Sequence, residues 1–300
     1  MPTASDSLRT WCPSRERRFT TRLLCDHDAV VAVGTDDANA HRRYTALAHY
    51  CGSEILTSDG RFVCRSGSTC ATSALRRPGR AFFEGQLSYL GRHYDTCTDE
   101  GVPLRVLVVP METGREREHV DLDMRRDEVL ASAALPFRKR NPHMRGVTVA
   151  LRLAFGCDLD EEPEGEYLLA PGGRIHLFEA FAMANLLLCS AVKTETTKSA
   201  QTAVMRSQCS RHLAATVNVL APTLVISQGK RLSPALNDLF ALETRHSAQV
   251  STRTVGGTRF VWVDLFHPTF TWDWLARPYL WQVAVPAIRL ARTMALTESD

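Results

Sequence analysis

The sequence predicts an α/β protein, a three-layer sandwich in which a central, mainly parallel four-stranded sheet is flanked by helices. Two observations lead to this prediction. Short hydrophobic runs rich in β-branched residues recur along the chain, and most are continuous rather than alternating, as in strands buried on both faces. Helical patterns lie between these runs, and strands that alternate with helices indicate a parallel sheet covered on both sides.

The predicted strands share a short apolar stretch that polar or turn-forming residues follow. They span Leu104–Pro110, Ala184–Cys189, Thr223–Ser227 and Arg259–Phe266. The first three are almost wholly hydrophobic.

The helices are predicted from apolar spacing and stop signals. Residues 210–220 place Leu213, Val217 and Leu220 on one helical face, and Pro222 ends that helix before the next strand. Residues 147–155 form a second apolar helix, which Gly156 closes. A third helix is expected over residues 41–50.

Composition narrows the classes of protein to consider. The chain has 300 residues, 44% of them hydrophobic, and its 36 basic and 33 acidic side chains give a net charge of +3. This balance disfavours a disordered tail or a histone-like polycation. No run reaches the ~18–20 apolar residues that span a membrane, and the first residues lack the apolar core of a secretory signal. We therefore expect a soluble, cytoplasmic monomer.

The chain divides into two unequal parts. Residues 1–60 are predicted to be an N-terminal extension that mixes basic and polar side chains, and residues 61–300 to be the α/β domain. Within that domain, residues 158–166 are expected to be a solvated acidic turn. Residues 192–208, which are polar and rich in Thr and Ser, are expected to be an excursion between a strand and a helix.

Polar residues follow the predicted strands. In an open parallel sheet, ligands bind outside the carboxyl ends of the strands. Those ends are expected to collect Glu112, Asn185, Cys189 and His267, while Gln228-Gly-Lys follows the third strand. This edge of the sheet is the predicted functional site.

The cysteines need a separate explanation. Their number is nine, which is odd, and a reducing compartment disfavours a disulfide framework. Cytosolic cysteines are more often buried apolar residues, redox thiols or metal ligands.

Three segments together resemble the iron–sulfur uracil-DNA glycosylases. Asn185-Leu-Leu-Leu-Cys189, then Cys209-Ser-Arg-His-Leu213, then residues 221–229 follow that family's order of Asn, Cys, Cys, Pro, strand and Gly. His267-Pro-Thr-Phe270 resembles the superfamily's His-Pro-Ser type loop, and residues 107–114 stand where its first motif belongs. The similarity covers roughly residues 60–285, and it implies a uracil-DNA-glycosylase-like domain over residues 61–300.

The chain also departs from the family pattern. Five residues separate Cys64 from Cys70, which is more than is usual, and nineteen separate Cys189 from Cys209. In the first motif, the family's glutamate position falls on Met111, and Glu112 aligns with the catalytic Asp of other branches. The resemblance is therefore to a divergent member.

The resemblance implies a role for each residue at the site. Glu112 would be the carboxylate that stabilises positive charge on the sugar, and His267 would donate a hydrogen bond to the departing base. Asn185 would match the uracil O4 and N3–H edge. A flipped-out base needs an aromatic partner, for which Phe137 is the first candidate and His143 the second. The alternatives are a helix cap for Glu112, turn residues for Asn185 and His267, and a core position for Phe137.

The resemblance also implies a structural [4Fe–4S] cluster, whose ligands would be Cys64, Cys70, Cys189 and Cys209. Zinc on the same thiols and plain buried thiols are the alternatives. Cys51 is the reserve ligand. No task is assigned to Cys12, Cys25, Cys97 and Cys157.

The implied partner is uracil-containing DNA, and local positive charge supplies most non-specific affinity for DNA. A candidate phosphate-binding patch comprises Arg138, Lys139, Arg140 and Arg145, and the pair Arg115 and Arg117 could act in the same way. An ordinary solvated face is the alternative.

Two functional hypotheses follow. The first is a DNA base-excision glycosylase that hydrolyses the N-glycosidic bond of uracil or a related damaged base. The second is a weak or inactive member that holds a nucleobase or single-stranded nucleic acid without cleaving it. A nucleotide-dependent oxidoreductase is disfavoured, because no Gly-x-Gly-x-x-Gly turn follows the first predicted strand.

Overall fold

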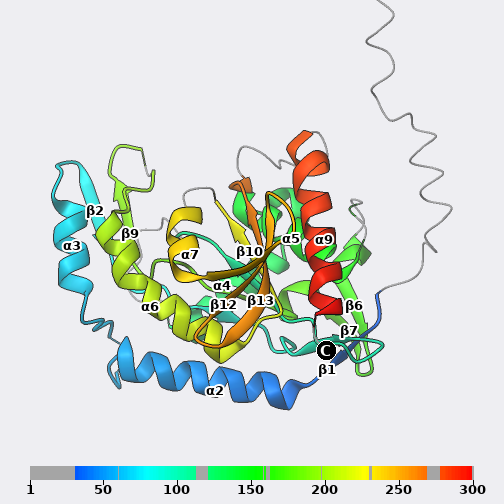
Figure 1. Ribbon diagram of the computed structural model, residues 1–300. Helices are drawn as coiled ribbons and strands as arrows, with labels where there is room; N and C mark the ends of the chain where they lie inside the picture. The colour runs from blue at the N-terminus through cyan, green and yellow to red at the C-terminus, as the bar shows by residue number, and fades with distance from the viewer. Residues whose placement is uncertain are drawn as a thin grey trace, which may run out of the picture.

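The fold is described from a computed structural model that covers residues 31–59, 61–112, 121–157, 159, 163–196, 198–229, 232–268 and 278–298 (Figure 1). Within these ranges no helix is long and apolar enough to cross a membrane.

The centre of the molecule is a seven-stranded mixed sheet, ordered β11-β12-β13-β10-β5-β8-β3. The four strands β13, β10, β5 and β8 pair in parallel. Antiparallel pairs join β3 to β8, β12 to β13 and β11 to β12. The bounds are β3 (Tyr89–Leu90), β5 (Val106–Val109), β8 (Phe181–Met183), β10 (Leu224–Gln228), β11 (Ala241–Arg245), β12 (Val250–Val255) and β13 (Thr258–Leu265). The α/β class is confirmed, and the expected four-stranded parallel sheet is the centre of a larger mixed sheet.

The central strands are buried on both faces, which explains their continuous apolar sequence. In β5, Val106 and Val108 belong to one hydrophobic core, whereas Leu107 and Val109 belong to the other. This split follows from the period of two along a strand, which points successive side chains to opposite faces.

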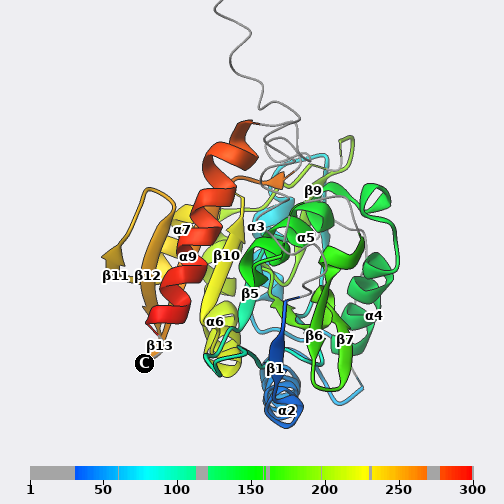
Figure 2. The same ribbon diagram turned by 90° about the vertical axis from the view of Figure 1, so that its right-hand side faces the viewer.

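Helices cover both faces of the sheet (Figures 1 and 2). One core packs α5 (Pro142–Phe155) and α9 (Val285–Thr297) on the sheet, and the other packs α6 (Ala203–Leu220) and α7 (Ser233–Leu239). The π-helical turn η4 (Leu280–Ala284) leads into α9, and α4 (Leu122–Ala133) contacts β3. The expected three-layer arrangement is therefore present.

Residues 31–59 share the core of the α/β domain. Helix α2 (Asp37–Glu54) packs against α6 and buries Leu47 and Cys51 in the same core. Asp36 caps its first turn by accepting a hydrogen bond from the Asn39 amide. The helix expected over residues 41–50 is confirmed and is longer at both ends.

Short two-stranded ribbons surround the sheet. Strand β1 (Val33–Thr35) pairs with β4 (Thr96–Thr98), β2 (Arg80–Phe83) with β9 (Ser190–Lys193), and β6 (Tyr167–Ala170) with β7 (Gly173–His176). The remaining elements are α3 (Gly67–Leu75) and three 3-10 turns, η1 (Phe137–Lys139), η2 (Pro163–Glu166) and η3 (Leu177–Glu179).

The second predicted strand was placed too late in the sequence. The strand is β8, which ends at Met183, and residues 184–189 are irregular. Their backbone still follows the neighbouring chain, because the amides of Leu186 and Leu187 donate to the carbonyls of Pro110 and Met111. The predicted excursion over residues 192–208 was wrong at both ends, since β9 runs to Lys193 and α6 begins at Ala203 with Thr202 as its cap.

The acidic turn ends in a buried charge rather than a solvated one. Glu166 is 5% exposed, and its carboxylate pairs with Arg140, Arg152 and His176. Burial alone would raise the pKa of Glu166, but the bonds and charges of these partners lower it to about 2. Asp158 and residues 160–162 lie outside the described residues.

Candidate functional site

The predicted edge of the sheet does gather polar side chains from neighbouring parallel strands. Glu112 lies three residues after β5, Asn185 two residues after β8, and His267 two residues after β13, while Gln228 is the last residue of β10. Because these strands are parallel and adjacent, their carboxyl ends share one edge. We call this edge, with these four residues and His143, the carboxyl-edge site.

Several polar atoms of this site are buried without a hydrogen-bond partner among the described residues. They are Glu112 Oε1, Asn185 Oδ1, both amide atoms of Gln228, and both ring nitrogens of His143. An unsatisfied buried polar group costs about 1–3 kcal/mol, and such groups are uncommon in native proteins. Their concentration at one edge indicates that water or a ligand supplies the missing bonds.

Only one of the two carboxylate oxygens of Glu112 has a hydrogen-bond partner among the described residues. Its Oε2 accepts a hydrogen bond of 3.1 Å from the Ala191 amide at the start of β9, and the Ser199 hydroxyl lies nearby. Burial raises the pKa of Glu112 to about 7, against the opposing effects of these two donors. The side chain is therefore close to half protonated at neutral pH.

Asn185 belongs to a short chain of amides. Its Nδ2 donates to Gln86 Oε1 at 3.4 Å, and Gln86 Nε2 donates to the Ser190 hydroxyl at 3.2 Å. The Gln86 backbone amide also donates to the Leu188 carbonyl. These bonds fix the orientation of the Asn185 amide and leave its Oδ1 as the open acceptor.

His143 and His267 come together from different elements. Asn141 caps α5, Pro142 occupies its first turn, and His143 follows. The rings of His143 and His267 stack with centroids 6.1 Å apart. Glycine at position 146 permits this approach, because a Cβ there would lie 2.1 Å from Pro268 Cγ.

Both imidazoles are neutral near pH 7. Burial, with the charges of His267 and Arg125, lowers the pKa of His143 to about 3. Burial also lowers the pKa of His267. A neutral imidazole offers one N–H donor and one acceptor, so each ring can hydrogen bond to a neutral base.

Two of the sequence-predicted residues have other roles. Phe137 packs against the hydrophobic core beside α5, which favours the core alternative. Of the two aromatic candidates, His143 is the one that lies at the carboxyl-edge site. Arg140 is 4% exposed, and its guanidinium bonds Glu166, Thr148 and the backbone carbonyls of residues 132, 133 and 135. We therefore remove Arg140 from the predicted phosphate-binding patch.

The other described members of that patch differ in exposure. Arg138 and Lys139 are exposed on η1, and Arg145 is half-buried on α5. Arg115 and Arg117 lie outside the described residues.

The four predicted cluster ligands pack against the same hydrophobic core. Cys70 is on α3, Cys209 is on α6, Cys189 precedes β9, and Cys64 packs against the same core. Burial raises the pKa of the Cys209 thiol to about 12, with contributions from Cys70 and Cys64. Burial likewise raises the pKa of Cys189, with contributions from Cys209 and Cys70. Electrostatic interactions therefore connect the four thiols.

The reserve ligand does not belong to this thiol group. Burial alone raises the pKa of Cys51 to about 12, and no neighbouring thiol contributes. Within the described residues, no three or more His, Cys, Asp or Glu side chains are placed to hold a metal ion.

Two polar side chains lie close to Cys64, the least buried of these thiols. His212 Nε2 lies 3.4 Å and Arg211 Nη2 lies 3.8 Å from Cys64 Sγ. The Tyr50 hydroxyl lies 2.8 Å from the other ring nitrogen of His212.

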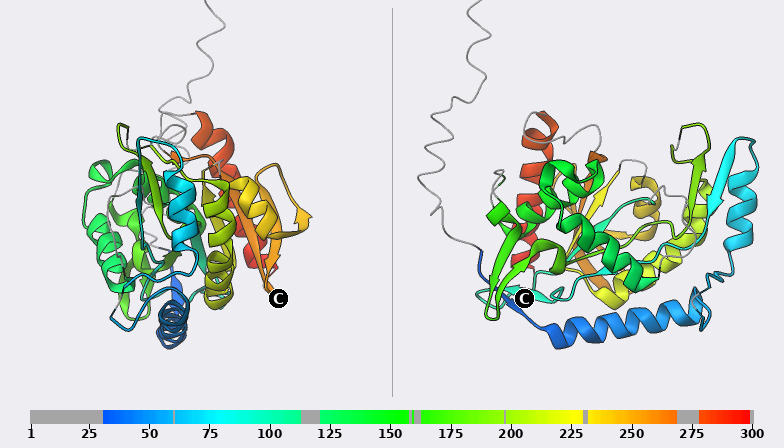
Figure 3. Two further views of the ribbon diagram at one scale, coloured as in Figure 1. Left: turned by 90° about the vertical axis from the view of Figure 1, so that its left-hand side faces the viewer. Right: turned by 180° about the vertical axis from the view of Figure 1, so that it is seen from behind.

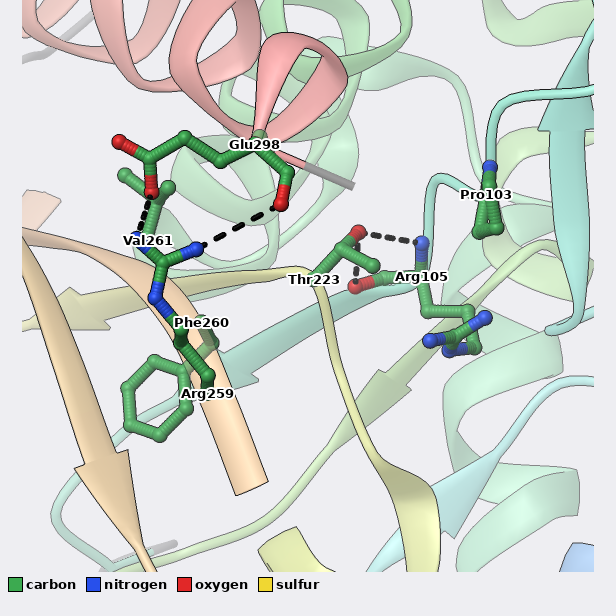
Figure 4. Close-up of a pocket in the computed structure, with 8 residues that line it drawn as sticks. Pro103, Arg105, Thr223, Arg259, Phe260, Val261 and Glu298 are labelled. Atoms are coloured by element: carbon green, nitrogen blue, oxygen red, sulfur yellow. Dashed lines mark hydrogen bonds and ion pairs between the residues drawn. The ribbon is translucent and has the colours of Figure 1, made fainter. Parts of the chain in front are cut away.

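A surface pocket of the described residues lies elsewhere. Figure 4 shows it at the opposite, amino edge of the sheet, where it has a volume of about 200 Å³. There Arg259 pairs with Glu298, and Thr223 bonds the backbone of Arg105. Because its charged groups already have partners, this pocket is a weaker candidate than the carboxyl-edge site.

Sequence reasoning missed two contributors to the site. Gln228 was noticed as following the third strand, but its burial between β5 and β13 could not be read from the sequence. Gln86 precedes β3 far from any motif, and no sequence signal marks it.

No protein-family model matches the chain, and its sequence matches no curated protein.

Proposed function

We propose that the chain is a DNA glycosylase that excises uracil or a related damaged base by hydrolysing its N-glycosidic bond. The observation that best supports this proposal is the set of buried polar atoms at the carboxyl-edge site that have no partner among the described residues. A nucleobase edge presents alternating donors and acceptors, and this site offers acceptors and donors that have no other partner.

Base recognition is assigned to two amides. Asn185 Oδ1 is an acceptor with no partner in the described residues, and it suits the uracil N3–H. The fixed bond from its Nδ2 to Gln86 keeps this oxygen in place. Gln228 adds a second amide that can bond either a base carbonyl or a phosphate-side water.

The two histidines are assigned to the leaving base. As the glycosidic bond breaks, negative charge develops on the base, and an N–H donor stabilises it. A neutral His267 keeps one ring N–H, which can donate this hydrogen bond. His143 stacks on that ring at 6.1 Å and supports its orientation.

Glu112 is assigned to the sugar. Positive charge develops there in the transition state, and a carboxylate stabilises it. Burial raises the pKa of Glu112 to about 7, so the ionised form that this role needs becomes more abundant as the pH rises through that value. Excision should therefore increase with pH through about 7.

The thiol group is assigned to a [4Fe–4S] cluster with a structural role. The donor set fits, because three buried thiols and the partly buried Cys64 come from separate segments and pack against one hydrophobic core. In a cubane each thiolate binds a different iron, so the thiolates stand farther apart than around one zinc ion. When bound, the cluster would tie α3 to α6.

A second candidate, base binding without cleavage, is favoured by one observation. The hydrogen bond of Glu112 runs to Ala191 in β9, whereas His267 follows β13, two strands away from β5 in the sheet. If Glu112 keeps this orientation when a base is bound, the carboxylate and the histidine do not act on the same bond.

Excision from an oligonucleotide with a single uracil separates the two candidates. We expect activity in the wild type, loss of about 10²-fold or more in Glu112→Ala, and weaker uracil discrimination in Asn185→Asp. Glu100→Ala, which removes an exposed carboxylate elsewhere, is the matched control. Tight uracil binding with no excision by the wild type would favour the second candidate.

A further inference from the structure

An arm made of one helix and a two-stranded ribbon lies beside the carboxyl-edge site. It consists of α3, β2 and β9, and its tip is formed by two turns, Arg76 to Gly79 and Lys193 to Thr196, with Lys198. The Thr194 amide donates to the Gly79 carbonyl, so the two turns lie side by side. Figures 1 and 3 show the tip pointing to the same side as the carboxyl ends of β10 and β13.

The tip is strongly basic. Its cations outnumber its single described acid, Glu195, and they are Arg76, Arg77, Arg80, Lys193 and Lys198. All are exposed except Arg80, which is half-buried and donates to the Ala200 carbonyl. Within the described residues, Arg76, Arg77, Lys193 and Lys198 form no ion pair.

The register of the arm increases this concentration of charge. Arg80 and Lys193 are directly opposite each other on β2 and β9. Like charges at directly opposed positions destabilise a strand pair. An arrangement that is unfavourable for the isolated fold becomes favourable when a polyanion lies across the tip.

The root of the arm is part of the carboxyl-edge site. β9 begins at Ser190, which accepts from Gln86, and the next residue, Ala191, holds Glu112. Lys193 is two residues further along the strand, a rise of about 7 Å. A base bound near Glu112 would therefore bring the phosphates flanking it within reach of the tip.

We propose that the tip of the arm is a docking surface for the phosphate backbone of DNA. The expected placement of DNA beside the carboxyl-edge site rests on the proposed function, but phosphate binding by the tip requires neither uracil nor excision. The cations would bind phosphates without reading sequence, and would orient the strand so that one nucleotide faces the carboxyl-edge site.

The test is the salt dependence of binding to a fluorescein-labelled, uracil-free duplex, measured by anisotropy. Each lost phosphate contact reduces the slope of log K against log salt by ~0.9. We expect the variant Arg76→Ala, Arg77→Ala, Lys193→Ala, Lys198→Ala to have a slope shallower by about 3 to 4. The control, Arg42→Ala, Arg174→Ala, Arg245→Ala, Arg289→Ala, removes four exposed arginines from α2, β7, β11 and α9.

The outcomes separate this proposal from the proposed function. A shallower slope only in the tip variant supports the docking surface, even if the wild type excises no base. An equal change in both variants, or none in the tip variant, overturns it, even if uracil is excised. Circular dichroism of the two variants checks that both remain folded.

Discussion

Replacing Glu112 by glutamine tests the physical basis of the site without needing a substrate. The carboxyl is buried, with one oxygen bonded to the Ala191 amide and the other without a described partner, and its pKa is raised from 4.5 to about 7. One pKa unit corresponds to 1.36 kcal/mol, so ionising this group in the folded protein costs about 3 kcal/mol.

The sign of the effect follows from linkage. A raised pKa means that the folded state holds the proton more tightly than the unfolded chain. Protonated Glu112 therefore contributes its full stabilisation of the folded state below about pH 4.5, and this stabilisation is lost as pH rises through about 7. Glu112→Gln cannot ionise, so its stability relative to the wild type should rise by about 3 kcal/mol between pH 4.5 and pH 8.

Urea unfolding of both proteins at several pH values measures this difference directly. The other titrating groups are common to both chains and cancel in the comparison. Glu100→Gln serves as the control for removing an exposed carboxylate. A difference between variant and wild type that stays constant with pH would show that Glu112 is not held in a desolvating site, and would refute the argument.

Three further predictions address separate parts of the structure. Glu166→Gln should lower the free energy of unfolding by about 3–5 kcal/mol, because it leaves Arg140 and Arg152 as buried cations. Adding Arg140→Met should recover part of this loss in the same urea titrations; a loss under 1 kcal/mol in the single variant would contradict the buried pair. Cys209→Ala should lose most of the iron and sulfide measured after anaerobic purification, whereas Cys51→Ala should retain them; equal retention would remove Cys209 from the ligand set. Gln228→Leu should leave the protein at least as stable, since it removes two unpartnered amide atoms, but should weaken uracil binding in equilibrium dialysis; unchanged binding would exclude Gln228 from the site.

The sequence predicted the central layers because burial on both faces leaves a clear pattern. The continuous apolar runs at residues 106–109 and 224–228 are strands, and the helix that ends at Gly156 ends there in the left-handed conformation. The strand near residue 184 was misplaced because residues 184–189 are as apolar as a strand. They are buried there by packing into one of the two hydrophobic cores rather than by sheet pairing.

Charge was harder to interpret than hydrophobicity. A run such as Arg138-Lys-Arg140 looks uniformly solvated, yet its third member is buried against Glu166, which is distant in the sequence. The pairing of Arg80 with Lys193 likewise depends on strands that are far apart in the chain. Such tertiary pairs are invisible to local patterns, whereas the positions of Glu112 and His267 followed from the ends of the predicted strands.

The most direct test of the central proposal is the release of free uracil. Anaerobically purified protein would be incubated in excess over an oligonucleotide that carries one uracil, and the released base would be quantified by chromatography. The proposed function predicts one free uracil for each oligonucleotide with the wild type and almost none with Glu112→Ala. An intact oligonucleotide after prolonged incubation with protein that carries its full complement of iron would contradict it.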